Sequence, residues 1–162
     1  MIKHYNVELE SPIGVIEIIG TKTVVQSILF LDREKAIEDK NDIPSVLLDC
    51  RNQLLEYFNG QRQTFTFPFQ YSGTPFQHNV WNSLVRIPFA ETASYRDIAI
   101  KLQKEKAVRA VGNANGKNKL SIVVPCHRII GSSGSLTGYA GGLWRKEWLL
   151  NHEKKVKETQ LV

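Results

Sequence analysis

The chain has 162 residues, of which 42% are hydrophobic and 23% charged, a composition typical of a globular protein with a real core. No apolar run approaches the roughly 18 residues of a membrane span, and the first residues lack the apolar core of a signal peptide. The two cysteines, Cys50 and Cys126, are far apart, which argues against a disulfide framework or a cysteine-based zinc site. This cysteine usage favours a reducing interior, the cytoplasm or, in a eukaryote, the nucleus.

The net charge of +5 conceals an asymmetry between the two halves of the chain. Residues 1–73 carry a net charge of −3, whereas residues 74–162 carry +8. A basic half of this size indicates a polyanionic partner, with nucleic acid the first candidate. Solvated surface lysines would produce the same count, so charge alone leaves both readings open.

The first half predicts a small α/β domain. Three β-branched segments, residues 5–9, 14–19 and 23–31, are separated by turn residues and are typical of a strand meander. Apolar residues at helical spacing predict an amphipathic helix over residues 43–58, ending at Asn59-Gly60, with Cys50 as core filler. Residues 64–69 predict one more strand, and residues 70–75 a connector. We therefore expect a first domain over residues 1–73 and a second over residues 74–162.

The second half predicts mainly helices. Residues 76–87 share an apolar face and are followed by Pro88, while Ser94 and Asp97 have the spacing of a capping box at the start of another helix. Small apolar residues over 107–114 repeat at the spacing of a further helix. Two short helices joined by a turn over residues 103–106 indicate a helix-turn-helix. The second carries small side chains and a single arginine, which favours non-specific duplex binding through the DNA backbone; a pair of core helices packed through alanines is the alternative.

The most reactive stretch is Ile122–Ile130, whose sequence is IVVPCHRII. The apolar run predicts a buried strand that ends at Pro125, because proline cannot donate to a sheet. Cys126 would follow directly, with His127 and Arg128 as a base and a positive charge that promote the thiolate. A buried structural cysteine is the alternative, and chemistry alone leaves it open.

Several motifs together resemble the O6-alkylguanine-DNA alkyltransferases, also called methylated-DNA–protein-cysteine methyltransferases. The similarity is close over residues 76–153 and rests on Tyr95, RAVG at 109–112, Asn118, PCHR at 125–128, GYAGG at 138–142, Lys146 and Glu153. The resemblance implies a ribonuclease-H-like α/β domain followed by a mainly α, winged-helix-like domain with a helix-turn-helix. It implies direct-reversal DNA repair by a single-use enzyme that needs no cofactor and no metal. Lys119 departs from the family pattern, which usually has proline after the asparagine.

The resemblance also implies a role for each residue that matches. Cys126 would attack the alkyl group of O6-alkylguanine in double-stranded DNA, His127 would act as its base through a water, and Glu153 would orient His127. Asn118 would brace the active-site segment, and Tyr95 would help to turn out the nucleotide and donate to guanine. The residues expected to contact DNA are Tyr95, Arg96, Arg109, Ala110, Gly112 and Asn115, with Arg109 filling the gap left by the extruded base. Those expected in the substrate pocket are Pro125, Ile129, Tyr139, Ala140, Gly141 and Lys146.

Arg128 is expected to be structural, pairing with an acid or with carbonyl groups. We expect a monomer, and leave open whether molecules cluster on DNA and whether O4-alkylthymine is also repaired. Two other functions compete with alkyl transfer. A lesion sensor would bind DNA with an inert thiol, and a cysteine hydrolase would turn over and need an oxyanion hole, which no sequence feature marks.

Overall fold

The computed structural model describes residues 1–160, and these form two compact units. The first unit comprises residues 1–72 together with Lys119–Ser121, and the second comprises residues 73–118 and the described residues from Ile122 onward. None of the helices within residues 1–160 combines the length and apolar character that crossing a membrane requires.

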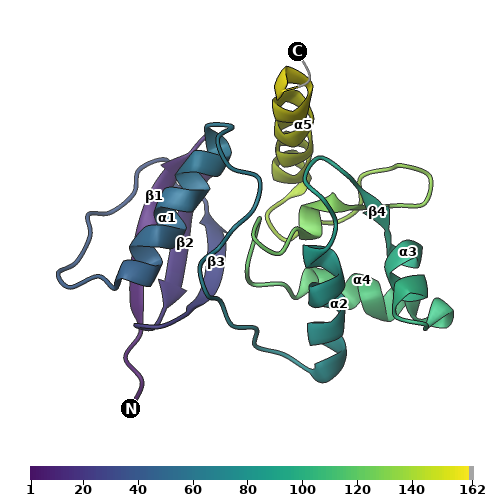
Figure 1. Cartoon of the computed structure of the whole chain (residues 1–162), viewed down its shortest axis with the longest axis horizontal. Helices are drawn as coiled ribbons and strands as arrows, with labels where there is room; N and C mark the ends of the chain where they lie inside the picture. The colour runs from purple at the N-terminus through teal and green to yellow at the C-terminus, as the bar shows by residue number, and fades with distance from the viewer. Residues whose placement is uncertain (161–162) are drawn as a thin grey trace. The chain divides into compact units, whose positions relative to one another are not determined.

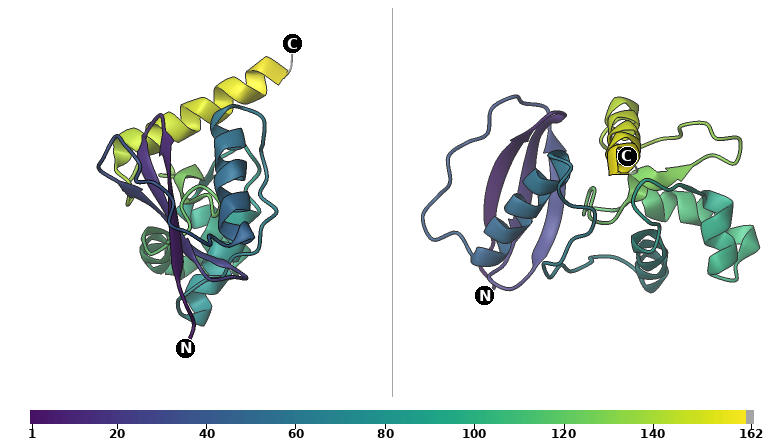
Figure 2. Two further views of the ribbon diagram at one scale, coloured as in Figure 1. Left: turned by 90° about the vertical axis from the view of Figure 1, so that its left-hand side faces the viewer. Right: turned by 45° about the horizontal axis from the view of Figure 1, so that its top comes forward.

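The first unit is built on a three-stranded antiparallel sheet in the order β1-β2-β3. Its strands are β1 (Tyr5–Ser11), β2 (Gly14–Gly20) and β3 (Val25–Leu31), so the predicted meander is confirmed. Helix α1 (Ser45–Phe58) packs along one face of this sheet, as Figures 1 and 2 both show. The helix ends before Asn59 and Gly60, as predicted, and Gly60 has a positive φ of 77°. Cys50 is fully buried in this core, where burial raises the pKa of its thiol.

The strand predicted over residues 64–69 is wrong. The segment makes a single bridge to β3, in which Val25 N donates to Pro68 O (3.0 Å) and Gln70 N donates to Val25 O (2.9 Å). Pro68 has no N–H with which to extend a ladder. Alternate aromatic side chains instead line up, with ring centroids 6.1, 6.4 and 5.6 Å apart along Phe65, Phe67, Phe69 and Tyr71. The segment is therefore extended and held by ring packing, with one isolated bridge in place of a strand ladder.

Lys119–Ser121 belongs to the first unit because it pairs with β3. Ile28 N donates to Lys119 O (2.8 Å) and Ser121 N donates to Ile28 O (3.2 Å). Lys119 occupies the position where the resembled family usually has proline. In this chain two backbone hydrogen bonds restrain the turn. A proline at this position would instead restrain it by fixing φ.

The second unit contains α2 (Pro75–Val85), β4 (Ala93–Ser94), α3 (Tyr95–Lys101), η1 (Glu105–Ala107), α4 (Val108–Gly116), η2 (Cys126–Arg128), β5 (Ile129–Ile130) and α5 (Leu143–Gln160). The predicted capping box at the start of α3 is confirmed: Asp97 N donates to Ser94 Oγ (3.0 Å), and Ser94 N donates to Asp97 Oδ2 (2.9 Å). Helices α3 and α4 pack against each other and against α2 (Figure 1). Trp81 Nε1 on α2 donates to Ala114 O on α4 (2.8 Å), which fixes the helix-turn-helix on its support.

The strand predicted before Pro125 is also wrong, although the segment is buried as expected. Residues 121–124 form turns, and Ile122 has a φ of 71°, a left-handed value that a β-branched residue rarely adopts. Cys126 N donates to Val124 O (2.7 Å), which closes a tight turn around Pro125. Cys126 therefore begins a single 3-10 turn, η2, and does not follow a strand.

Candidate active site

Cys126 lies in a buried turn that its neighbours hold from both sides. Its residue surface is 5% exposed. Arg128 N donates to Pro125 O (2.9 Å) and closes the 3-10 turn that carries the cysteine. Asn118, just beyond α4, donates from Nδ2 both to Cys126 Sγ (3.2 Å) and to Val124 O (2.9 Å). One side-chain amide therefore joins the end of the helix-turn-helix to the thiol and to the turn that precedes it.

A buried carboxylate organises the residues behind the cysteine. Glu153 on α5 is 0% exposed. It accepts from His127 Nε2 (2.7 Å), from Arg128 Nε (2.8 Å) and Nη2 (3.0 Å), and from the backbone N–H of Ala90 (3.1 Å). Arg128 also donates to Ile87 O (2.8 Å), so the predicted structural role of Arg128 is confirmed. Four donors on one carboxylate satisfy both of its oxygens, which is what a buried charge requires.

Burial and the contact with Glu153 together set the protonation state and tautomer of His127. Burial opposes ionisation of Glu153, but the hydrogen bonds from His127 and Arg128 and the positive charge of Arg128 outweigh it and hold the pKa of that carboxyl below its usual range. An ionised carboxylate only accepts, so the proton of a neutral imidazole lies on Nε2. Burial also lowers the pKa of His127, which keeps the ring neutral. The buried Nδ1 has no protein hydrogen-bond partner among the described residues and carries a free lone pair.

The thiol is neutral at rest. Burial raises the pKa of Cys126, while the Asn118 amide, the Lys146 charge and a hydrogen bond with Tyr139 pull it down. The sequence suggested that Arg128 supplies the nearby positive charge, but Arg128 is engaged by Glu153. The positive charge near Cys126 comes from Lys146, which is fully buried on α5. A neutral thiol close to a neutral imidazole can pass its proton to that base when it reacts.

Tyr95 is the first residue of α3, and its hydroxyl lies 2.6 Å from Thr137 Oγ1 in the loop before α5. A Cβ placed on Gly112 of α4 would lie 3.7 Å from the Tyr95 ring, so the ring packs against that helix where it has no side chain. Lys146 Nζ donates to Thr137 O (3.2 Å). Tyr95 and Lys146 therefore both contact Thr137, and Gly112 supports the Tyr95 ring.

The loop at residues 138–142 closes by a turn in which Gly142 N donates to Tyr139 O (2.9 Å). Gly142 has a φ of 95°, which favours glycine, and Arg145 Nη1 donates to Gly141 O (3.0 Å). Tyr139 is half-buried and Ala140 is exposed. The other two residues expected in the pocket are buried: Pro125 precedes η2, and Ile129 begins β5, where it pairs with Ala93 of β4.

The residues expected to contact DNA do not all share one environment. Arg96, Arg109 and Ala110 are exposed, and Gly112 is half-buried beneath Tyr95. Asn115 is 5% exposed, and its buried Oδ1 has no hydrogen-bond partner among residues 1–160. Asn115 lies on the inner side of α4 with Val111 and Ala114, so the expectation of a groove contact from its side chain needs correction.

Nothing in the sequence marked two residues that contact the site, Ala90 beside Glu153 and Thr137 beside Tyr95 and Lys146. Ala90 has a φ of 65° and directs its N–H at Glu153; an alanine carries no signal for that backbone conformation. Thr137 was missed because it precedes the glycine-rich motif and resembles an ordinary loop residue.

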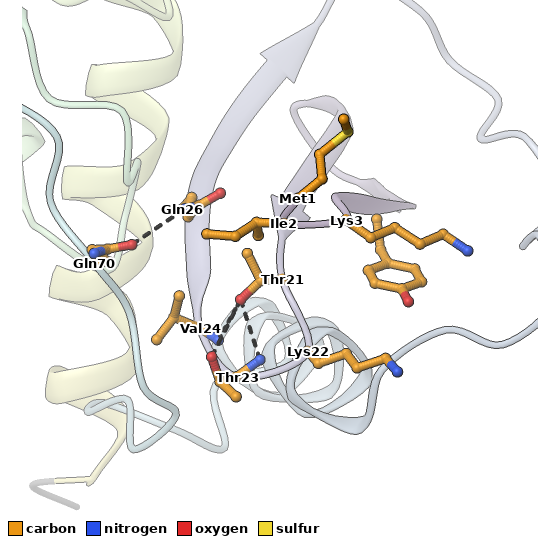
Figure 3. Close-up of a pocket in the computed structure, with 10 residues that line it drawn as sticks. Met1, Ile2, Lys3, Thr21, Lys22, Thr23, Val24, Gln26 and Gln70 are labelled. Carbon is orange, nitrogen blue, oxygen red and sulfur yellow. Dashed lines mark hydrogen bonds between the residues drawn. The ribbon is translucent and has the colours of Figure 1, made fainter.

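No group of three or more metal-ligating side chains is gathered in residues 1–160. A surface pocket of about 580 Å³ lies in the first unit beside the N-terminal residues, where Gln26 Nε2 donates to Gln70 Oε1 (3.2 Å) (Figure 3). None of the expected site residues lines this pocket.

Two family models together match most of the chain. The family model described as 6-O-methylguanine DNA methyltransferase, DNA binding domain, matches residues 75–155. The model described as 6-O-methylguanine DNA methyltransferase, ribonuclease-like domain, matches residues 4–71.

Similar proteins cover nearly the whole chain. The constitutive methylated-DNA–protein-cysteine methyltransferase of Bacillus subtilis is 43% identical over 159 residues, covering 93% of this chain and 96% of that protein. The crystal structure of O6-methylguanine methyltransferase from Mycobacterium tuberculosis has a TM-score of 0.84 at 39% identity and covers 94% of both chains. The structure of OGT from the same organism in complex with DNA has a TM-score of 0.85 at 40% identity, again over 94% of both chains.

Proposed function

The chain belongs to the 6-O-methylguanine DNA methyltransferase family, and from this premise we propose that it repairs DNA by direct reversal. Cys126 takes the alkyl group from an O6-alkylguanine in duplex DNA, once per molecule. The observation that carries the proposal is the buried arrangement in which Asn118 binds Sγ and Glu153 holds the adjacent His127. The relatives' names and the DNA complex of a similar structure support DNA as the partner.

In the proposed first step, the thiol of Cys126 loses its proton to His127. A water between Sγ and Nδ1 carries the proton, because Nε2 is already committed to Glu153. Glu153 stabilises the imidazolium that forms, as an orienting acid does for a catalytic histidine. The Asn118 amide and the Lys146 ammonium then stabilise the thiolate.

In the second step, Sγ attacks the alkyl carbon of the lesion. The new S–C bond forms as the C–O6 bond breaks, and the electron pair of the broken bond stays with guanine. The Tyr95 hydroxyl donates to guanine and neutralises the developing charge, which makes guanine a better leaving group. The product thioether has no activated leaving group, so water does not release the alkyl group and the protein is spent.

Access to the lesion requires the nucleotide to leave the stack. Extrusion costs a few kcal/mol. We propose that exposed Arg109 on α4 enters the duplex and fills the gap, while Arg96, Ala110 and Gly112 face the DNA. Because these contacts are mainly to the backbone, binding is insensitive to sequence and weakens with salt.

The extruded base occupies a pocket formed by the loop 138–142, Lys146 and the buried turn at Pro125 and Ile129. In this proposal residues 74–162 bind DNA and transfer the alkyl group, and residues 1–73 form a separate domain. The protein acts as a monomer in the cytoplasm, or in the nucleus of a eukaryote, where the thiol remains reduced.

The test compares the wild-type chain with Cys126→Ala and, as a matched control, Cys50→Ala. Each is mixed with a duplex containing one O6-methylguanine, and lesion loss and DNA binding are measured separately. We expect Cys126→Ala to bind the duplex but leave the lesion intact, and Cys50→Ala to clear it. Lesion loss with Cys126→Ala would refute the assignment of the nucleophile. Binding by the wild type without any lesion loss would indicate a sensor, and many lesions cleared per chain would indicate a hydrolase.

A further inference from the structure

We infer that Thr137 is a positioning residue for alkyl transfer, whose hydroxyl directs the Tyr95 phenol toward the extruded base. The inference rests on the proposed function, since it gives Tyr95 an orienting partner in that same site. Thr137 lies one residue before the GYAGG motif at 138–142 and outside the motifs on which the family resemblance rests.

The Tyr95 side chain is held at two points. Its hydroxyl lies 2.6 Å from Thr137 Oγ1, at the short end of the range for O–H···O hydrogen bonds. Its ring packs over Gly112, where an added Cβ would be 3.7 Å from two ring carbons. The ring contact fixes the plane of the phenol, and the Thr137 hydroxyl fixes the tip.

Thr137 is itself restrained. A Cβ added to Gly131 would lie 3.4 Å from Thr137 Cγ2, so the methyl group faces that glycine. Because threonine is β-branched, fixing the methyl group also fixes the direction of the hydroxyl. Its carbonyl oxygen accepts from Lys146 Nζ (3.2 Å), which ties the backbone of the loop to a fully buried ammonium.

Thr137 therefore contacts both the residue proposed to act on the leaving guanine and the residue that acts on the thiol. Its side chain holds the group that acts on guanine, and its carbonyl holds Lys146, whose charge lowers the pKa of Cys126. A phenol that donates to guanine has an oxygen free to accept, and the Thr137 hydroxyl then donates to that oxygen. This donation stabilises the negative charge that builds on the phenol as guanine draws its proton.

The experiment uses Thr137→Val, which keeps the shape but removes the hydroxyl, and Thr137→Ser, which keeps the hydroxyl. The rate of methyl transfer to Cys126 is measured at saturating protein, and duplex affinity is measured separately. We expect Thr137→Val to slow transfer about three- to tenfold, the range for losing one hydrogen bond. The duplex affinity and melting temperature of Thr137→Val should stay at wild-type values. Thr137→Ser should retain most of the wild-type rate.

A double-mutant cycle with Tyr95→Phe separates positioning from packing. Because Thr137 acts through the Tyr95 hydroxyl, Thr137→Val should have no further effect in the Tyr95→Phe background. Wild-type rates for Thr137→Val, or the same fold-loss in both backgrounds, would overturn the inference while leaving the proposed function intact. Equal slowing by Val and Ser together with a lower melting temperature would also overturn it, because that pattern reports packing. A wild-type chain that gains no methyl would refute the proposed function and this inference with it.

Discussion

Replacing Glu153 by glutamine tests the buried cluster behind the cysteine. The carboxylate accepts from His127, from two nitrogens of Arg128 and from Ala90 N, all within 3.1 Å. Glutamine has nearly the same shape but keeps only one acceptor oxygen and turns an NH₂ group toward these donors. The substitution therefore removes the charge and part of the hydrogen bonding without opening a cavity.

The expected loss of stability is large because Arg128 is buried and cannot lose its proton. Removing one partner of a buried ion pair costs about 3–5 kcal/mol. At roughly 2–4 °C per kcal/mol for a chain of this size, the melting temperature should fall by about 6–20 °C. Glu147→Gln is the matched control, because Glu147 is exposed on the same helix, and surface changes stay within about 0.5 kcal/mol.

The assay is urea unfolding at neutral pH followed by tryptophan fluorescence, since Trp81, Trp144 and Trp148 all lie in the second unit. The double variant Arg128→Met with Glu153→Gln should recover part of the loss, because no charge is then stranded. If Glu153→Gln stays within about 1 kcal/mol of the wild type, the carboxylate is not the buried partner that this reasoning requires.

Four further predictions follow from the site. Asn118→Ala should slow methyl transfer by about ten- to a hundredfold, because a hydrogen bond to a charged group is worth about 1.5–3 kcal/mol; an unchanged single-turnover rate would contradict the thiolate contact. Arg109→Ala should impair repair of a duplex more than reaction with the free base O6-benzylguanine, and equal losses on both would exclude a role in filling the stack. Folding stability should fall as the pH drops below about 6.5, the ordinary pKa of histidine. The lowered pKa of His127 means that the folded state binds fewer protons than the unfolded chain in this range. The lowered pKa of Glu153 adds a further loss of stability below about pH 4.3. Melting temperatures across this range check it, and a stability that rises on acidification would refute it. Methylated protein should be less stable by about 1–3 kcal/mol, because the added group overpacks a buried site, and identical unfolding curves before and after reaction would count against that.

The features predicted correctly from the sequence were local ones, in which a residue type strongly favours a single structural role. The capping box at Ser94 and Asp97, the glycine after α1 and the alanine-rich α4 all formed as predicted. In each case the side chain or backbone preference acts within a few residues, so no knowledge of the rest of the fold was needed.

The errors came from segments whose conformation depends on distant partners. The apolar run before Pro125 is buried but forms turns, because Asn118 supplies the hydrogen bond to Val124 O that a neighbouring strand would supply in a sheet. Periodicity cannot distinguish a buried turn from a buried strand. Helix α5 escaped prediction because it buries Lys146 and Glu153 while exposing Trp144, which removes the usual apolar stripe. Lys146 and Glu153 are also residues to which we assign roles in alkyl transfer, so the burial of charge that hid the helix also draws attention to the proposed site.

The central claim is that Cys126 is consumed by accepting one alkyl group. Intact-protein mass spectrometry after incubation with excess O6-methylguanine duplex measures this directly. The account predicts a single burst that adds the mass of one methyl group to every chain, with peptide mapping placing it on Cys126. An unchanged mass, or a methyl group found on another residue, would contradict it.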